Sequence, residues 1–88
     1  MGVVVLGVSV SVEELRLALM SAGLGDTTCV GREGDLSVAT LELDQPDLYH
    51  VFSRFRETNI WPALLAEGKY RYCSGNEWLN INEIIVTL

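Results

Sequence analysis

An alternating apolar strand that runs directly into a helix start is the feature of this chain that most constrains its fold. The residues from Val3 to Val10 alternate with the two-residue period of a β-strand, and both faces are apolar in the first half. This pattern predicts a central strand that is covered on two sides. Ser11 and Glu14 then complete an S-x-x-E capping box, in which the serine caps a helix and the glutamate bonds back to the cap's amide.

A helix over residues 12–22 follows from the spacing of the next apolar side chains. Those that recur at helical intervals are Val12, Leu15, Leu19 and Ala22. Gly23 can take the left-handed conformation that stops a helix, with Leu24 folding back onto Leu19. The first quarter of the chain is therefore predicted as a strand followed at once by a helix.

The middle of the chain predicts a hairpin and a second helix. Strands are expected at residues 27–31 and 36–43, joined by a loop over residues 32–35. Pro46 suits the first turn of a helix over residues 46–58, with Asp44 or Gln45 as its cap.

The C-terminal third gives a less regular pattern. We expect a short helical turn at residues 63–67 that is ended by Gly68, and a strand at residues 69–73. Residues 78–81 fit either a strand or a loop, and residues 81–88 read as a final apolar strand.

The expected element order, βαββαβ(β), belongs to the α+β class. We expect two helices packed on one face of a mainly antiparallel sheet of four to five strands, with a ferredoxin-like sandwich as the favoured arrangement. The chain has 88 residues and no repeat, low-complexity stretch or linker, so residues 1–88 are expected to form a single compact domain.

Charge and aromatic residues are divided between the two halves of the chain. Residues 1–47 hold eight acids, two arginines and no aromatic ring, whereas residues 48–88 carry no net charge and all seven aromatic residues. The whole chain has a formal net charge of −6. Localised charge of this kind can select a partner.

The acidic residues of the hairpin and the turn that follows it form the main candidate for a binding surface. They are Glu33, Asp35, Glu42, Asp44 and Asp47. The hairpin is expected to bring several of them to one end of the sheet, where they would attract a protein with a basic surface. The alternative is that these acids only keep a rather apolar domain soluble.

Four aromatic residues are not assigned to the core by their periodicity, namely Trp61, Tyr70, Tyr72 and Trp78. Large amphipathic rings are enriched at interface hot spots, so one or two of them are expected on a contact surface. Phe52 and Phe55 differ, because their helical spacing places them in the core.

Metal, phosphate and nucleic-acid binding each lack a convincing signal. One histidine and two distant cysteines fall short of a zinc ligand set, and no calcium-loop pattern is present. The glycines at 23 and 25 end a helix, whereas phosphate sites use glycines that precede one. Six basic residues against twelve acidic ones disfavour nucleic acid. We therefore expect no metal, no cofactor and no direct nucleic-acid partner.

The chain is expected to be soluble and cytoplasmic. No apolar run reaches the length of a membrane helix, and the opening lacks the basic region of a secretory signal. Cys29 and Cys73 are expected to be reduced, partly buried thiols, because a buried cysteine behaves as a small hydrophobe.

The leading functional hypothesis is a small acidic, non-enzymatic protein that binds another protein, as an inhibitor, an immunity factor or an accessory subunit. The alternative is a regulatory or small-ligand-sensing module that forms a homodimer, because the strands near both ends are apolar enough to face a second copy. An enzyme that uses Asp47, His50 and Arg54 on one side of the second helix is the third hypothesis.

Overall fold

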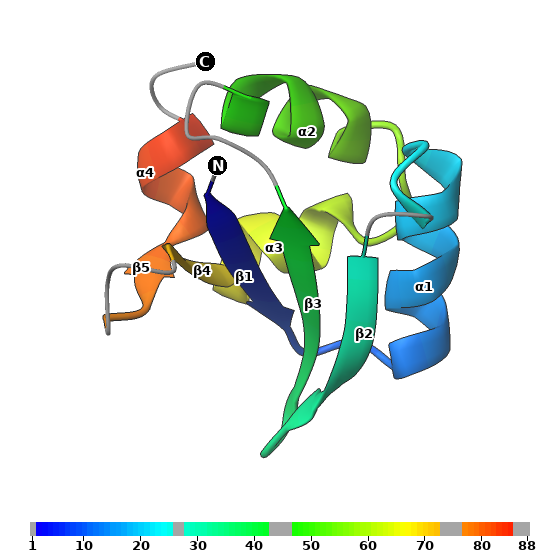
Figure 1. Cartoon of the computed structure of the whole chain (residues 1–88), viewed down its shortest axis with the longest axis horizontal. Coiled ribbons are helices and arrows are strands. Elements are labelled where there is room, and N and C mark those ends of the chain that lie inside the picture. Colours follow the sequence, from blue (N-terminus) through cyan, green and yellow to red (C-terminus); the bar gives the residue numbers. More distant parts are fainter. Residues whose placement is uncertain (1, 26–27, 43–46, 73–76, 86–88) are drawn as a thin grey trace.

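Within the residues that the structure describes, the chain forms one five-stranded sheet and four helices (Figure 1). This computed structural model describes residues 2–25, 28–42, 47–72 and 77–85, with only the backbone described at residues 84 and 85. The elements are β1 (Val3–Val8), α1 (Val12–Ser21), β2 (Thr28–Glu33), β3 (Leu36–Glu42), α2 (Leu48–Phe55), α3 (Trp61–Glu67), β4 (Lys69–Tyr72), β5 (Leu79–Asn80) and α4 (Ile81–Ile85). The chain is therefore an α+β protein, as its sequence predicted.

The sheet has the strand order β2-β3-β1-β4-β5, and every neighbouring pair is antiparallel. The first strand lies at its centre, where Val4 faces Leu41 of β3 on one side and Tyr72 of β4 on the other. The predicted central position of this strand is thus confirmed, whereas the predicted covering of both of its faces is not, because the helices of the core cluster pack on the face of Val4, Leu6 and Val8. The edges are β2 and the two-residue β5.

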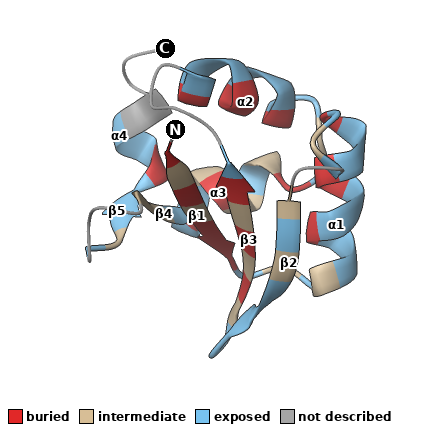
Figure 2. Ribbon diagram, viewed as in Figure 1, coloured by how far each residue is buried: buried red, intermediate tan, exposed pale blue. Residues whose placement is uncertain are grey.

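The main core lies on one face of this sheet. Side chains alternate between the two faces of a strand, and Val4, Leu6 and Val8 of β1 are all fully buried. Every helix adds buried residues to the same cluster, including Leu15 from α1, Phe52 and Phe55 from α2, Leu64 from α3 and Ile81 from α4. In Figure 1, α1 lies alongside β2 and α3 lies behind β1, and these two helices contact those strands. Buried residues accordingly line the inner sides of the helices in Figure 2.

Both ends of α1 follow the sequence signals. The Glu14 amide donates to Ser11 Oγ at 3.1 Å, which caps the first turn as predicted. The Glu14 carboxylate accepts from the Ser11 hydroxyl at 3.3 Å, where the capping box predicted a bond from the Ser11 amide. Gly23 has a φ of +76°, and the Leu24 amide donates to the Leu19 carbonyl at 2.8 Å. This is the Schellman geometry that the glycine allows, so the predicted helix stop is confirmed.

The hairpin between β2 and β3 is tighter than predicted. Its strands extend through Glu33 and Leu36, which face each other, so the turn contains two residues in place of the expected four. Gly34 has a φ of +61°, and a glycine in that conformation is enough to reverse the chain in two residues.

The helices that follow differ from their expected lengths. The second helix begins at Leu48 and ends at Phe55, which is shorter than the predicted range of 46–58, and Asp44 and Gln45 lie outside the described residues. The predicted helical turn is a seven-residue helix, α3, with Pro62 in its first turn and Gly68 at its end. The expectation of two helices was therefore too low.

The prediction of a final strand over residues 81–88 was wrong where the structure describes it, because residues 81–85 form the helix α4. Asn80 Oδ1 accepts a hydrogen bond of 2.8 Å from the Asn82 amide, which satisfies one of the first amides of that helix. Ile81 is fully buried in the core. Ile81, the first residue of the predicted strand, is thus packed in the core as the first residue of α4.

The opposite side of the sheet, which we call the uncovered face, carries none of the helical residues of the core cluster. Its members alternate along the strands with the residues that point into the core. They comprise Val3, Val5 and Gly7 of β1; Leu36, Val38, Thr40 and Glu42 of β3; Cys29, Gly31 and Glu33 of β2; and Lys69 and Arg71 of β4. Gly7 is buried, with the side chains of Leu36 and Trp78 beside it. Cys29 is a free, exposed thiol, which corrects the expectation that it is partly buried, because it lies on an edge strand. Cys73 lies outside the described residues.

Tyr70 provides a pH-dependent test of its own packing against the main core. Burial raises the pKa of its phenol above the ordinary value of 10.0, with further increases from the charges of Glu83 and Tyr49. A folded-state pKa above the unfolded value means that the stabilising contribution is complete below pH 10.0 and is lost as pH rises through the folded pKa. We expect an absorbance titration of the wild type, minus that of Tyr70→Phe, to give a midpoint above 10.0. A midpoint at or below that value would contradict the described burial.

Candidate functional site

The predicted acidic surface is divided between the two ends of β3. Glu33 and Asp35 lie at the hairpin turn, whereas Glu42 ends β3 and Asp47 precedes α2. All four are exposed, and Asp44 lies outside the described residues. The two pairs are separated by the length of the strand, about 20 Å at roughly 3.3 Å per residue. The described acids therefore do not gather at one end of the sheet, because the hairpin is long and its tip points away from α2.

Glu33 also has a partner within its own chain. Arg71 Nη2 lies 3.4 Å from Glu33 Oε2, and the same guanidinium lies 4.5 Å from the centroid of the Trp78 ring. The Trp78 ring in turn lies on the uncovered face, where a Cβ added to Gly7 would come within 3.5 Å of it. These contacts connect the hairpin with the segment that follows β4.

The four aromatic candidates separate into two groups. Trp61, Tyr70 and Tyr72 are half-buried and pack against the main core, the tyrosines because their register places them beside Leu6 and Val4. Trp78 is the member of the set that lies on the uncovered face.

The residues of the enzyme hypothesis line a hollow of about 290 Å³. Asp47, His50 and Arg54 border it together with Leu24, Leu41, Glu42 and Val51. Arg54 Nη1 donates to the Ala22 carbonyl at 3.4 Å, at the end of α1. The arginine is thus held against a helix terminus, where a cation is favourable.

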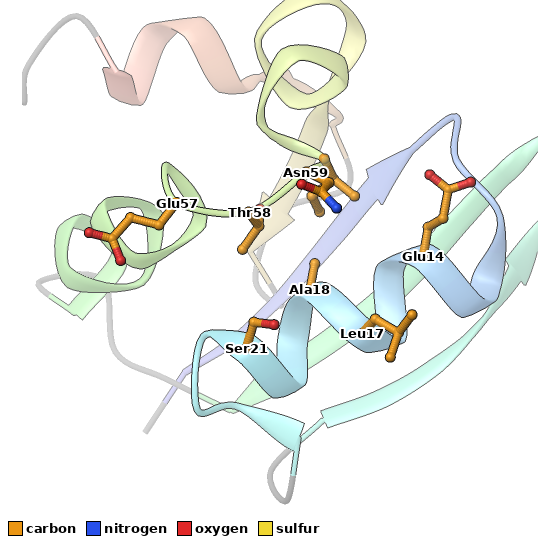
Figure 3. Close-up of a pocket in the computed structure, with 8 residues that line it drawn as sticks. Glu14, Leu17, Ala18, Ser21, Glu57, Thr58 and Asn59 are labelled. Carbon is orange, nitrogen blue, oxygen red and sulfur yellow. The ribbon is translucent and has the colours of Figure 1, made fainter.

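A second hollow lies between α1 and the turn that joins α2 to α3 (Figure 3). We call it the α1 groove, and it has a volume of about 300 Å³. It is lined by Glu14, Leu17, Ala18, Ser21, Glu57, Thr58, Asn59 and Ile60. Figure 3 shows the side chains of Glu14 and Glu57 at opposite ends, with Ala18 between them. The groove therefore combines two carboxylates with an apolar floor.

Local structure fixes most of the groove's walls. Glu14 belongs to the capped first turn of α1, and Thr58 Oγ1 donates to the Phe55 carbonyl at 2.7 Å. Ala18 and Ile60, which form the floor, are buried in the core. Leu17 is different, because 61% of it is exposed to solvent.

The groove continues into a larger hollow of about 590 Å³. The two share Ser21, Glu57 and Thr58, and the second extends past Gly23 to Arg54. Together they follow α1 from its first turn to its C-terminal end, which gives room for an extended segment.

The groove residues were not among the sites that the sequence indicated. One signal was available, because Leu17 and Met20 fall outside the apolar stripe of α1 and are 61% and 62% exposed. Apolar side chains on the outer face of a helix indicate a contact surface. Glu57 and Asn59 carry no comparable signal, since only the tertiary fold brings them beside α1.

No family model, curated protein or solved structure matches this chain. No helix in the described ranges is both long and apolar enough to cross a bilayer. In the same part of the chain, no three histidine, cysteine or acidic side chains come together as metal ligands.

Proposed function

We propose that this protein is a small acidic, non-enzymatic binding protein whose α1 groove holds a basic segment of another protein. The observation that carries the proposal is that Glu14 and Glu57 lie at the two ends of a groove whose floor is apolar. Such a protein acts by occupying its partner, as an inhibitor, an immunity factor or an accessory subunit does.

The groove's chemistry defines the segment that it fits. Two basic side chains would meet the two carboxylates, and an aliphatic side chain between them would rest on Leu17 and Ala18. Exposed charge pairs contribute little affinity individually, about 0 to 1 kcal/mol, so the apolar contact supplies much of the binding energy.

The overall charge favours the same kind of partner. A net charge of −6 attracts a basic protein over a range of about 8 Å at physiological ionic strength. Electrostatic steering of this kind is the role that we propose for the acids recognised in the sequence, and it affects the association rate more than the final contacts. These acids are Glu33, Asp35, Glu42, Asp44 and Asp47.

A cytoplasmic location belongs to the proposal and is supported by the exposed free thiol of Cys29, which suits a reducing compartment.

We also assign the sheet to a ferredoxin-like arrangement. The first four strands pair in the order β2-β3-β1-β4, with α1 between β1 and β2 and with α2 and α3 between β3 and β4. On this assignment, β5 and α4 are additions at the β4 edge.

An NMR titration with a synthetic peptide tests the proposed function. The probe has two arginines that flank a leucine, and a peptide of equal length with glutamates in place of the arginines is the negative control. We expect saturable amide shifts centred on Glu14, Leu17 and residues 57–60, and weaker binding at higher salt.

Matched variants locate the binding surface. Glu14→Gln with Glu57→Gln is expected to weaken peptide binding by about threefold to tenfold, because two exposed charge pairs of about 0 to 1 kcal/mol each are lost. Glu42→Gln with Asp47→Asn makes the same change in charge at another site and is expected to leave most of the affinity. The proposal is wrong if the second pair has the larger effect or if the shifts fall outside the groove.

A further inference from the structure

Arg54 gives the α1 groove an end of opposite charge. Glu14 and Glu57 make the groove itself acidic, whereas the larger hollow that continues it reaches the guanidinium of Arg54. The charges along α1 are therefore negative at first and positive at the C-terminal end of the helix. An occupant that meets the whole length of this surface needs basic groups first and an acidic group last.

The side chain of Arg54 also closes this end of the groove. It starts from α2 and reaches the end of α1, where Nη1 donates to the Ala22 carbonyl at 3.4 Å. Arg54 lines the hollow of about 590 Å³ and also the hollow of about 290 Å³ that contains Asp47 and His50, so it stands between the two. An extended chain that follows α1 through the groove therefore meets the arginine with its tip.

The guanidinium of Arg54 is suited to receive a carboxylate there. It has five N–H groups, and the bond to the Ala22 carbonyl uses one of them. The amides of Gly23 and Leu24 donate to carbonyls within α1, which reduces the negative charge that a helix end presents to an anion. Arginine and carboxylate pair through two parallel hydrogen bonds, which gives the contact a defined geometry.

We propose that the α1 groove holds the C-terminal end of its partner chain, with the partner's terminal carboxylate on Arg54. The proposal rests on the proposed function, because it places a basic segment in the same groove. From Glu14 to Ala22, α1 rises about 12 Å at roughly 1.5 Å per residue, a distance that an extended chain covers in about four residues. The partner thus ends in a short basic tail.

The closed end of the groove favours a chain terminus over an internal acidic residue. An aspartate or glutamate side chain supplies the same carboxylate, but its chain then has to continue through the space that Arg54 occupies between α2 and Ala22. Glu57 adds a second requirement, because it lines the same hollow as Arg54 and repels a lone carboxylate. A basic side chain next to the terminus offsets this repulsion, so the two features of the tail act together.

Peptide titrations followed by NMR test the proposal. The probes are Arg-Leu-Arg peptides with an acetylated N-terminus and either a free C-terminal carboxylate or a C-terminal amide. We expect the free acid to bind about threefold to tenfold more tightly, because only its carboxylate pairs with Arg54. General attraction to a chain of net charge −6 predicts the opposite order, since the amide carries the larger positive charge.

Variants of the two arginines of this helix end locate the contact. Arg54→Gln is expected to abolish the preference for the free acid, while both peptides still bind through Glu14 and Glu57. Arg56→Gln makes the same change in charge two residues further along and is expected to keep the preference, because Arg56 lies over the Trp61 ring, 5.9 Å from its centroid. Arg54→Lys keeps the positive charge and is expected to retain part of the preference if Arg54→Gln proves unfolded by circular dichroism.

The outcomes separate this proposal from the proposed function. If acid and amide bind equally in the groove, recognition of the chain end is wrong and the proposed function stands. If neither peptide shifts Glu14, Leu17 or residues 57–60, both are wrong. A third peptide carries a glutamate after the second arginine and a C-terminal amide. Binding of this peptide as tight as that of the free acid would overturn the assignment of the carboxylate to a chain terminus.

Discussion

Leu15→Ala is expected to lower the free energy of unfolding by about 2 to 5 kcal/mol, the cost of emptying a filled position in a core. Leu15 is 0% exposed and lies between α1 and the sheet in the main cluster. Small domains are stable by only about 5 to 15 kcal/mol, so this one change removes a large part of the total. Urea denaturation followed by circular dichroism measures the loss.

Leu17→Ala is the matched control, because the same substitution is made two residues further along the same helix. Leu17 is 61% exposed, and its truncation is expected to change stability by less than about 0.5 kcal/mol. It is also expected to weaken peptide binding, since Leu17 lines the α1 groove. Equal destabilisation by the two variants would mean that α1 is rotated from the described orientation.

Gly68→Ala is expected to destabilise the protein by about 1 to 3 kcal/mol through overpacking. An added Cβ at Gly68 would lie 2.5 Å from the Leu64 carbonyl oxygen and 2.6 Å from Ile81 Cδ1. The first of these atoms belongs to the backbone of α3, so a simple rotamer change does not relieve the clash. The Ile81 amide also donates to the Gly68 carbonyl at 3.2 Å, which ties α4 to this position.

Gly31→Ala provides the control for Gly68→Ala. An added Cβ at Gly31 meets no atom within 4 Å, and Gly31 lies in the edge strand β2. Its replacement is expected to be neutral or slightly stabilising, because alanine restricts the unfolded chain. Thermal melts of the two variants compare the positions directly, and similar losses would contradict the close packing around Gly68.

The first half of the fold was predictable because its signals are local. Ser11 starts α1 and Gly23 ends it through bonds within a few residues, and the alternation of β3 depends on its own sequence. The shorter hairpin turn was missed because Arg32 and Glu33 are polar. They pair with Ser37 and Leu36 through backbone groups, which the side-chain pattern does not reveal.

The error at the C-terminus has a tertiary cause. An apolar run that begins at Ile81 fits a buried strand or a buried helix equally well by pattern alone. Its packing against Gly68 and the cap supplied by Asn80 favour the helix. The cap by Asn80 could have been recognised from the sequence, because it is local, whereas the contact between Ile81 and Gly68 depends on the tertiary fold.

The candidate site was less accessible to sequence analysis than the fold. Leu17 could be recognised as an apolar residue outside the stripe of α1, but its neighbour across the groove, Glu57, is distant in sequence. The acidic residues of the hairpin were recognised as exposed. Their distribution over both ends of β3 depended on the length of that strand.

The central place of β1 has a consequence for the synthesis of this chain. It precedes the other described strands in the sequence, yet Val4 pairs with Leu41 and Tyr72. A topology dominated by such distant pairings has a high contact order and folds slowly for its size. Until β4 has emerged, the nascent valine-rich strand has unpaired backbone groups along one edge, and an unpaired apolar edge is a template for aggregation. The strand order thus leaves β1 half-paired until the chain has been made as far as Tyr72.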